Sequence, residues 1–104
     1  MGPLQDNQIL VSRKKHPRIY LERVHKVFFS LNQESCYLQA VGASVQMAVD
    51  LALQVQQKYA GISMEVDTFT MPIVDEIVEG SSAHQVVVRT EERFNSGILI
   101  KLLR

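Results

Sequence analysis

The chain has 104 residues, of which 46% are apolar and 21% are charged, a composition typical of one soluble globular domain. Eleven Lys and Arg residues balance eleven Asp and Glu residues, so the formal net charge is zero and a histone-like polycation is excluded. The single cysteine, Cys36, excludes an internal disulfide and a cysteine-based zinc site, and it favours a reducing compartment. No apolar run approaches the roughly 18 residues of a membrane span, so we expect no membrane partner.

The charges are distributed unevenly along the chain. Residues 1–26 hold six basic and two acidic residues, residues 27–80 hold one basic and seven acidic residues, and residues 81–104 hold four basic and two acidic residues. A basic stretch on a neutral body suits a local contact with a polyanion. A solvated turn followed by an exposed helix face gives the same pattern, so charge alone does not decide between the two.

The first half of the chain predicts two strand–helix units. Residues 8–12 form a short β-branched apolar run typical of a buried strand, and Pro17 is well placed in the first turn of a helix. The apolar stripe of that helix consists of Tyr20, Val24, Val27, Phe28 and Leu31. Residues 32–34 end the helix, and residues 35–41 predict the second strand.

The second predicted helix follows Gly42, with Ser44 as its candidate cap and Gly61 at its C-terminal end. Its main apolar stripe consists of Val45, Ala48, Val49, Ala52, Val55 and Tyr59. Met47, Leu51 and Leu53 lie partly outside this stripe, so the helix is apolar on more than one side. Because a surface helix needs only one apolar face, the excess favours a second burial against a partner subunit.

The second half of the chain predicts a long hairpin. Apolar and polar residues alternate from residue 62 to residue 68, and the strand pattern continues to residue 78. Pro72 cannot donate to a ladder, which puts this strand at an edge or a bulge. Residues 86–88 extend the hairpin, residues 95–97 indicate a turn or bulge, and residues 98–103 predict a buried closing strand.

The predicted order is therefore β-α-β-α-β-β, an α/β (α+β) fold class. We expect a small mixed four-stranded sheet that carries two helices, with an extended hairpin formed by the last two strands. Residues 8–104 are expected to form this single domain, and residues 1–7 a flexible N-terminal tail.

No catalytic or metal-binding pattern stands out, so we expect no enzyme activity, no metal and no cofactor. His16, His25 and His84 show no ligand spacing, and Cys36 in mid-strand is more simply a buried thiol than a nucleophile. Asp75 and Glu76 are adjacent on a strand and point to opposite faces, which disfavours a general acid–base pair.

Two basic groups are candidates for contact with nucleic acid. Arg13, Lys14 and Lys15 lie between a buried strand and a helix start, where at least two of these cations must face solvent together. Arg89 and Arg93 lie on or near the final hairpin, which is long enough to reach along a groove. Glu91 and Glu92 leave open the alternative that these arginines form ion pairs on a surface arm.

The order and spacing of these segments resemble the Alba superfamily over nearly the whole chain. The resemblance is carried by residues 9–15 followed by Tyr20, by the strand–glycine–helix segment 38–50, and by residues 93–100, which resemble the last strand of eukaryotic branches. Those branches include small protein subunits of ribonucleases P and MRP and cytoplasmic proteins that bind messenger RNA.

The resemblance implies a dimer that binds RNA or DNA through phosphate contacts. Lys14 and Lys15 occupy the position of the family's paired lysines, and its hairpin arms are a second contact. The candidate nucleic-acid-binding residues are therefore Arg13, Lys14, Lys15, Arg18, Arg89 and Arg93. The basic residues that archaeal members carry around the glycine before the second helix are replaced here by Val41, Ala43 and Met47, which favours RNA over duplex DNA.

Three functional hypotheses follow. The first is a non-catalytic RNA-binding protein in messenger-RNA handling or translation control, cytoplasmic and also nuclear, acting as a homodimer or as a heterodimer with another Alba-domain protein. The second is a structural subunit of a ribonuclease P/MRP-like particle that binds RNA only with a partner. The third is a chromatin DNA-binding protein, against which the near-neutral charge counts.

Overall fold

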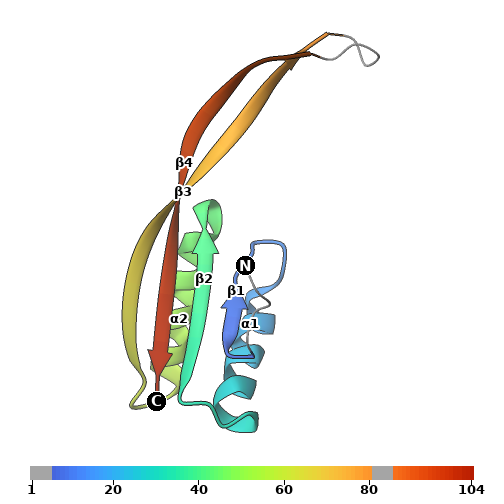
Figure 1. Ribbon diagram of the computed structural model, residues 1–104. Helices are drawn as coiled ribbons and strands as arrows, with labels where there is room; N and C mark the ends of the chain where they lie inside the picture. Colours follow the sequence, from blue (N-terminus) through green and yellow to red (C-terminus); the bar gives the residue numbers. More distant parts are fainter. Residues whose placement is uncertain (1–5, 81–85) are drawn as a thin grey trace.

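The computed structural model describes residues 6–80 and 86–104, and only the backbone at residues 77–79 and 86–88. The elements are β1 (Gln8–Leu10), α1 (Pro17–His25), a π-helical turn (Lys26–Ser30), β2 (Ser35–Val41), a 3-10 turn (Gly42–Ser44), α2 (Val45–Lys58), β3 (Ser63–Glu79) and β4 (Val86–Leu103). The predicted order and the α+β fold class are confirmed (Figure 1). Of the predicted tail, residues 1–5 lie outside the described residues, and the carbonyl of Asn7 accepts a 2.8 Å hydrogen bond from the Tyr37 N–H.

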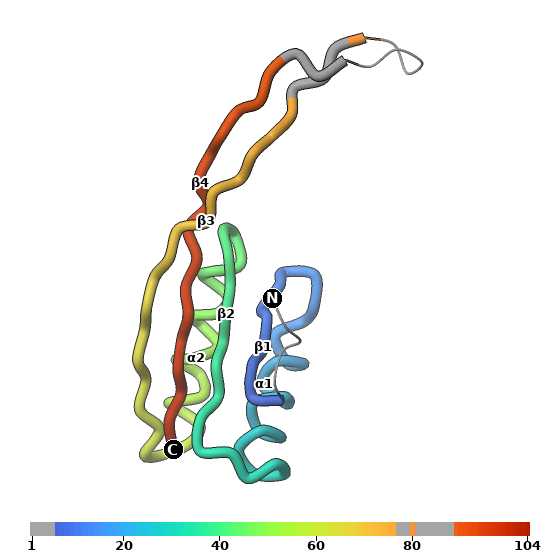
Figure 2. The backbone as a smooth tube through the Cα atoms, viewed as in Figure 1, coloured from blue at the N-terminus to red at the C-terminus, as the bar shows by residue number. Residues whose placement is uncertain are grey.

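The four strands form one mixed sheet in the order β1-β2-β4-β3. β1 runs parallel to β2, whereas β4 pairs antiparallel with both β2 and β3 (Figure 2). β3 is an edge strand, as Pro72 predicts, and its register with β4 shifts once, between Ile77 and Val78.

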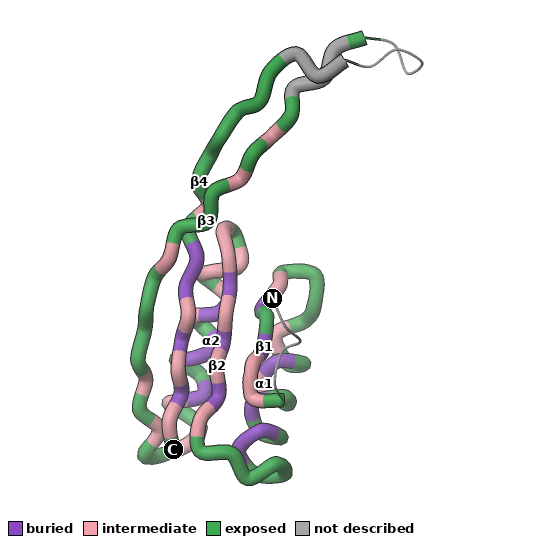
Figure 3. The backbone as a smooth tube through the Cα atoms, viewed as in Figure 1, coloured by how far each residue is buried: buried purple, intermediate pink, exposed green. Residues whose placement is uncertain are grey.

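The core lies between one face of the sheet and the two helices (Figure 3). Alternate residues of the central strands point into it: Cys36, Leu38 and Ala40 from β2, and Ile98, Ile100 and Leu102 from β4. Burial raises the pKa of the Cys36 thiol from 9.0 to about 12, although the positive charge of Arg23 acts in the opposite direction. Cys36 is therefore a structural thiol, as its position in the sequence predicts.

The first helix departs from the predicted stripe at its end. Tyr20, Val24 and Phe28 are almost fully buried, but Leu31 is 37% exposed. The Leu31 N–H donates to the carbonyl of Lys26, five residues earlier, because the last turn is π-helical. This wider turn moves Leu31 out of the 3.6-residue phase on which the prediction rests.

The second helix also differs from its predicted pattern. Ser44 makes no side-chain cap hydrogen bond, and Leu51 is 1% exposed in the core although it lies partly outside the predicted stripe. Leu53, in contrast, is 45% exposed. Among the large apolar residues of α2, all of which are described, Leu53 is the exposed one. In the described parts of the chain, no helix is long and apolar enough to cross a membrane.

Residues 95–97 form no turn, contrary to the sequence-based prediction, because β4 continues through them without interruption. Gly97 pairs with Phe69 across the strands, and the Phe69 ring lies where a side chain at Gly97 would be. Asn95 lies against Gly42, whose φ of +58° ends β2 in a conformation that suits glycine. The small and polar residues at 95–97 thus provide space for neighbours from β3 and from the β2–α2 junction.

β2 pairs with β4 only from Gly97 onward, so the part of β4 before Gly97 and its β3 partners leave the sheet as a two-stranded arm (Figure 1). This arm confirms the predicted extended hairpin. The arm accounts for the 58 Å long dimension of a molecule that is only 24 × 23 Å across. We use "arm" below for residues 70–80 and 86–96, of which the side chains at 70–76 and 89–96 are described.

We expect Gly97→Ala to lower the free energy of unfolding by about 1–3 kcal/mol, because the new methyl group overlaps the Phe69 ring and forces it to move. Urea unfolding followed by circular dichroism measures the loss. Ser96→Ala, on the neighbouring exposed residue, is the control and should leave the midpoint unchanged. Equal midpoints for Gly97→Ala and the wild type would contradict the packing described here.

Candidate nucleic-acid interface

Three connections meet at one end of the sheet. β1 and β2 run parallel, so the segment after β1 and the turn after β2 emerge at the same end. Val41, the last residue of β2, pairs with Gly97, where the arm begins. The β1–α1 connection, the start of α2 and the base of the arm therefore lie at the same end of the molecule (Figure 1).

The β1–α1 connection is fixed by a buried tyrosine. The Ser12 N–H donates to the Tyr20 hydroxyl oxygen at 2.8 Å, and the Tyr20 O–H donates to the Ser12 carbonyl at 3.0 Å. Tyr20 itself is 1% exposed. One core side chain thus satisfies both backbone groups of Ser12, and it holds the start of the connection against the first helix turn.

Arg13, Lys14 and Lys15 follow Ser12 and are all exposed; we call these three residues the basic turn. The Lys14 N–H donates to the Ser12 hydroxyl oxygen at 3.2 Å, and the Lys15 N–H donates to the Ser12 carbonyl at 3.4 Å. Across residues 6–80 and 86–104, none of the three side chains forms a salt bridge. The backbone is therefore held in place while the three charges face solvent, so the structure brings these predicted residues together.

The N-terminus of α1 adds a weaker positive field next to the basic turn. Pro17 occupies the first turn, and the His16 ring nitrogen Nδ1 accepts from the Arg18 N–H at 3.1 Å. His16 is thus the N-cap of α1. A helix N-terminus is favourable for an anion, so its effect has the same sign as that of the basic turn.

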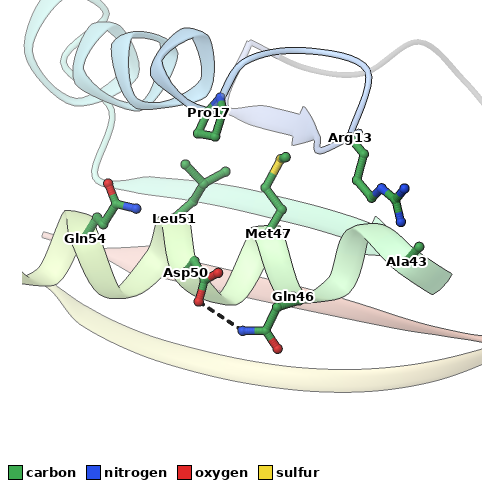
Figure 4. A pocket seen from close by; sticks show the side chains of 8 residues that line it. All are labelled: Arg13, Pro17, Ala43, Gln46, Met47, Asp50, Leu51 and Gln54. Atoms are coloured by element: carbon green, nitrogen blue, oxygen red, sulfur yellow. Dashed lines mark hydrogen bonds between the residues drawn. The ribbon is translucent and has the colours of Figure 1, made fainter.

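A groove of about 440 Å³ separates the basic turn from α2 (Figure 4). Its lining consists of Arg13, Pro17, Ala43, Gln46, Met47, Asp50, Leu51 and Gln54. Gln46 donates from Nε2 to Asp50 Oδ1 at 3.0 Å. The α2 wall thus offers amides and one carboxylate but no cation, so the positive charge of the groove comes from Arg13 alone.

Arg18 and Arg13 line different grooves. It lines a second groove, of about 380 Å³, with Leu21, Glu22 and His25 of α1 and Lys58 of α2. The structure therefore does not bring Arg18 into the groove that Arg13 lines, although both residues flank the helix start.

The two arginines of the arm are engaged in ion pairs. Arg93 Nε lies 2.7 Å from Asp75 Oδ2, and Arg89 Nη2 lies 3.0 Å from Glu91 Oε1. The side chains of both arginines are about two-thirds exposed, so these pairs are weak and can exchange. Nucleic-acid contact by Arg89 and Arg93 stays a prediction, and the arrangement matches the ion-paired alternative.

An aromatic cluster lies where α1 and α2 end, away from the basic turn, and the sequence analysis did not predict it. His25 Nδ1 lies 2.6 Å from the Tyr59 hydroxyl, and the Phe29 ring centroid lies 4.9 Å from that of His25 and 5.2 Å from that of Tyr59. The Lys58 ammonium lies 5.4 Å from the Tyr59 ring centroid. These residues come from three segments, and the only local signal was an aromatic residue, Phe29, outside the α1 stripe.

Within the described ranges, no group of three or more His, Cys, Asp or Glu side chains is arranged to hold a metal ion. Of the three histidines weighed as ligands, His84 lies outside the described residues.

Comparison with known proteins identifies the family. Residues 4–101 match the family described as "Rpp20 subunit of nuclear RNase MRP and P". The chain belongs to the Rpp20 family. It is 27% identical over 108 residues to the ribonuclease P protein subunit p20 of Mus musculus, Bos taurus and Homo sapiens, and each match covers 98% of this chain and 76% of the relative.

Solved structures show that this Rpp20-family chain has the Alba fold, which confirms the resemblance to the Alba superfamily. Alba from Thermoplasma volcanium superposes with a TM-score of 0.63 at 22% identity, over 94% of this chain and 100% of that one. ALBA1 from Trypanosoma brucei superposes with a TM-score of 0.61 at 12% identity, over 98% of this chain and 72% of that one.

We expect Tyr20→Phe to lower the free energy of unfolding by about 1–2 kcal/mol, because the Ser12 N–H loses its hydrogen-bond partner and the Ser12 carbonyl keeps only the 3.4 Å bond from the Lys15 N–H. Hydrogen exchange at the Ser12 amide should accelerate more than exchange at amides of β2. Tyr37→Phe is the matched control, since no hydrogen bond of the Tyr37 hydroxyl holds the basic turn. Unchanged protection of the Ser12 amide in Tyr20→Phe would contradict the assigned clamp.

Proposed function

We propose that this chain is a non-catalytic protein subunit of a ribonuclease P/MRP-type particle and that it contacts RNA phosphates through its basic turn. The match of residues 4–101 to the Rpp20 family carries the first part of the proposal. The exposed cations of Arg13, Lys14 and Lys15, on a backbone fixed by Tyr20, support the second part. The relatives' names describe protein subunits, which supports a non-catalytic role.

Contact with the phosphate backbone suits this geometry better than recognition of bases. Lysine is a flexible point charge, and neighbouring ammonium groups attract consecutive phosphates without a fixed hydrogen-bond pattern. The α2 wall of the adjacent groove contributes Gln46 and Gln54, whose amides are neutral hydrogen-bonding groups. We therefore expect binding that depends on salt and tolerates changes of sequence.

The comparisons favour this proposal over messenger-RNA handling in the cytoplasm. The family description names nuclear RNase MRP and P, which supports a nuclear site of action. The subunit of a ribonuclease P/MRP-like particle, stated above as the second hypothesis, is thus the one we adopt.

A second Alba-domain chain is the partner that we propose. Val66 pairs with the buried Ile100, so its side chain lies on the helix-bearing face of the sheet, yet it is 48% exposed because β3 is the edge strand. Helix α2 packs on β2 and β4, and its residue Leu53 is 45% exposed. Two aliphatic side chains on this side of the molecule support a contact between chains.

Lys14→Ala combined with Lys15→Ala should weaken binding of single-stranded RNA about tenfold, because two exposed phosphate contacts are lost. The slope of log K against log salt should become shallower by about 1.4. Fluorescence anisotropy of a labelled 20-nucleotide RNA, at several salt concentrations, measures both quantities, with the chain alone and with an Alba-domain partner.

The matched control for this pair is Lys26→Ala with Lys58→Ala, which removes the same charge from other exposed sites. Unchanged affinity in the Lys14/Lys15 variant, or an equal loss in the control, would refute the assigned site. Arg18→Ala, and Arg89→Ala with Arg93→Ala, test the remaining predicted residues in the same titration. Duplex DNA as a competitor tests the chromatin alternative.

Leu53→Asp should weaken association with the partner chain at least tenfold, because it puts a charge into an apolar contact. Light scattering of the purified chain, alone and mixed with an Alba-domain partner, measures the assembly. Ile19→Asp on α1 makes the same change at a residue of similar exposure, 43%, and should leave the mass unchanged. Equal effects of Leu53→Asp and Ile19→Asp would exclude the surface around Leu53 as the contact with the partner chain.

A further inference from the structure

The register of β3 and β4 divides the side chains of the arm between two faces. Residues directly opposite one another in an antiparallel pair share a face, and alternate residues along a strand share it too. The first face, which we call the apolar face, carries Pro72, Val74, Glu76, Thr90, Glu92 and Phe94. The second face, which we call the ion-paired face, carries Ile73, Asp75, Arg89, Glu91 and Arg93.

The apolar face exposes large side chains that the fold does not use. Phe94 is 67% exposed and Val74 is 62% exposed, the two highest values among the large apolar residues described. Pro72 lies directly opposite Phe94, and it is exposed as well. Single exposed apolar residues are common, but three neighbours with an aromatic residue among them are typical of a binding surface.

The charge of the arm is unsuited to phosphate. Its described side chains include four carboxylates and two arginines. Both arginines lie on the ion-paired face, and each is already paired there with a carboxylate. On the apolar face the ionisable side chains are Glu76 and Glu92, and Glu92 is directly opposite Val74. A phosphate that approached Phe94 from this side would meet negative charge.

The edge of β3 is a poor site for pairing with another strand. Pro72 has no N–H to donate, and the register shift at Ile77 and Val78 interrupts the ladder farther out. Recognition through side chains of the apolar face is therefore favoured over addition of a strand.

We propose that the apolar face of the arm binds a protein segment that inserts apolar side chains against Phe94, Val74 and Pro72 and places Lys or Arg beside Glu76 and Glu92. This surface is separate from the basic turn, and the proposal does not depend on RNA binding. Charge complementarity selects the partner, because a basic rim pairs with the two glutamates whereas an RNA strand is repelled. A two-stranded ribbon beyond the sheet is only marginally stable by itself, so the partner also stabilises the arm.

A photocrosslinker tests the proposal on the full chain. Thr90→Cys puts a benzophenone label on the apolar face, and Glu91→Cys puts it on the adjacent residue of the ion-paired face. Cys36 does not interfere, because its thiol is fully buried and its pKa is raised. Each labelled chain is irradiated in a cell extract from the organism whose genome encodes this protein. The products are digested with ribonuclease or protease, and the crosslinked segment is mapped by mass spectrometry.

The proposal is supported if the label at residue 90 crosslinks to a protein that the label at residue 91 does not capture. The crosslinked segment of that protein should contain both apolar residues and Lys or Arg. A synthetic peptide of that segment should bind the unlabelled chain, and both Phe94→Ser and Val74→Ser should weaken binding at least tenfold. Both variants should melt at the wild-type temperature, since both side chains are exposed.

An RNA product from position 90, the same products from both positions, or no product would overturn the proposal. Peptide binding that is insensitive to Phe94→Ser, or a peptide without basic residues, would overturn it too. RNA affinity separates the two proposals: Phe94→Ser should leave it unchanged. A failure of the Lys14/Lys15 titration would remove the RNA site without affecting the arm.

Discussion

The central position of β4 is the constraint on which the rest of the molecule depends. Its C-terminal half pairs with β2 on one side and β3 on the other, and Ile98, Ile100 and Leu102 fix it in the core. The same strand continues without interruption into the arm. The arm is therefore anchored through the sheet and its direction is set by the core, although only β3 pairs with it beyond Gly97.

The basic turn depends on the same core in a different way. The three cations of the basic turn have no apolar side chain among them to hold the turn, so its position comes from neighbouring residues. The hydroxyl of Tyr20 supplies that position by bonding both backbone groups of Ser12 from inside the core. The side chains remain solvated, and charge is presented on a fixed backbone without burial of any cation. Exposed charges on a hydrogen-bonded backbone suit a ligand with repeating phosphates.

Turn and arm begin at the same end of the sheet but differ in chemistry. The turn has cations with no carboxylate bound to them in the described structure, whereas the arginines of the arm form exposed ion pairs with carboxylates and its other face is apolar and acidic. A subunit of a ribonucleoprotein particle has to meet both RNA and protein. We infer that these two surfaces divide that task between them, the turn for RNA and the arm for protein.

The sequence by itself determined the element order, the bounds of β2 and the basic turn, because periodicity and local charge are properties of neighbouring residues. Only the tertiary structure decided the rest. Leu31 left the core through a π-helical turn, and Leu51 entered it. Residues 95–97 continued β4, where Gly97 makes room for the Phe69 ring and the Asn95 side chain lies against Gly42. The faces of the arm were likewise decided by the register of β3 with β4, which pairs residues about 20 positions apart. Contacts between distant segments fix burial and register, and no local pattern encodes which distant residue will be the neighbour.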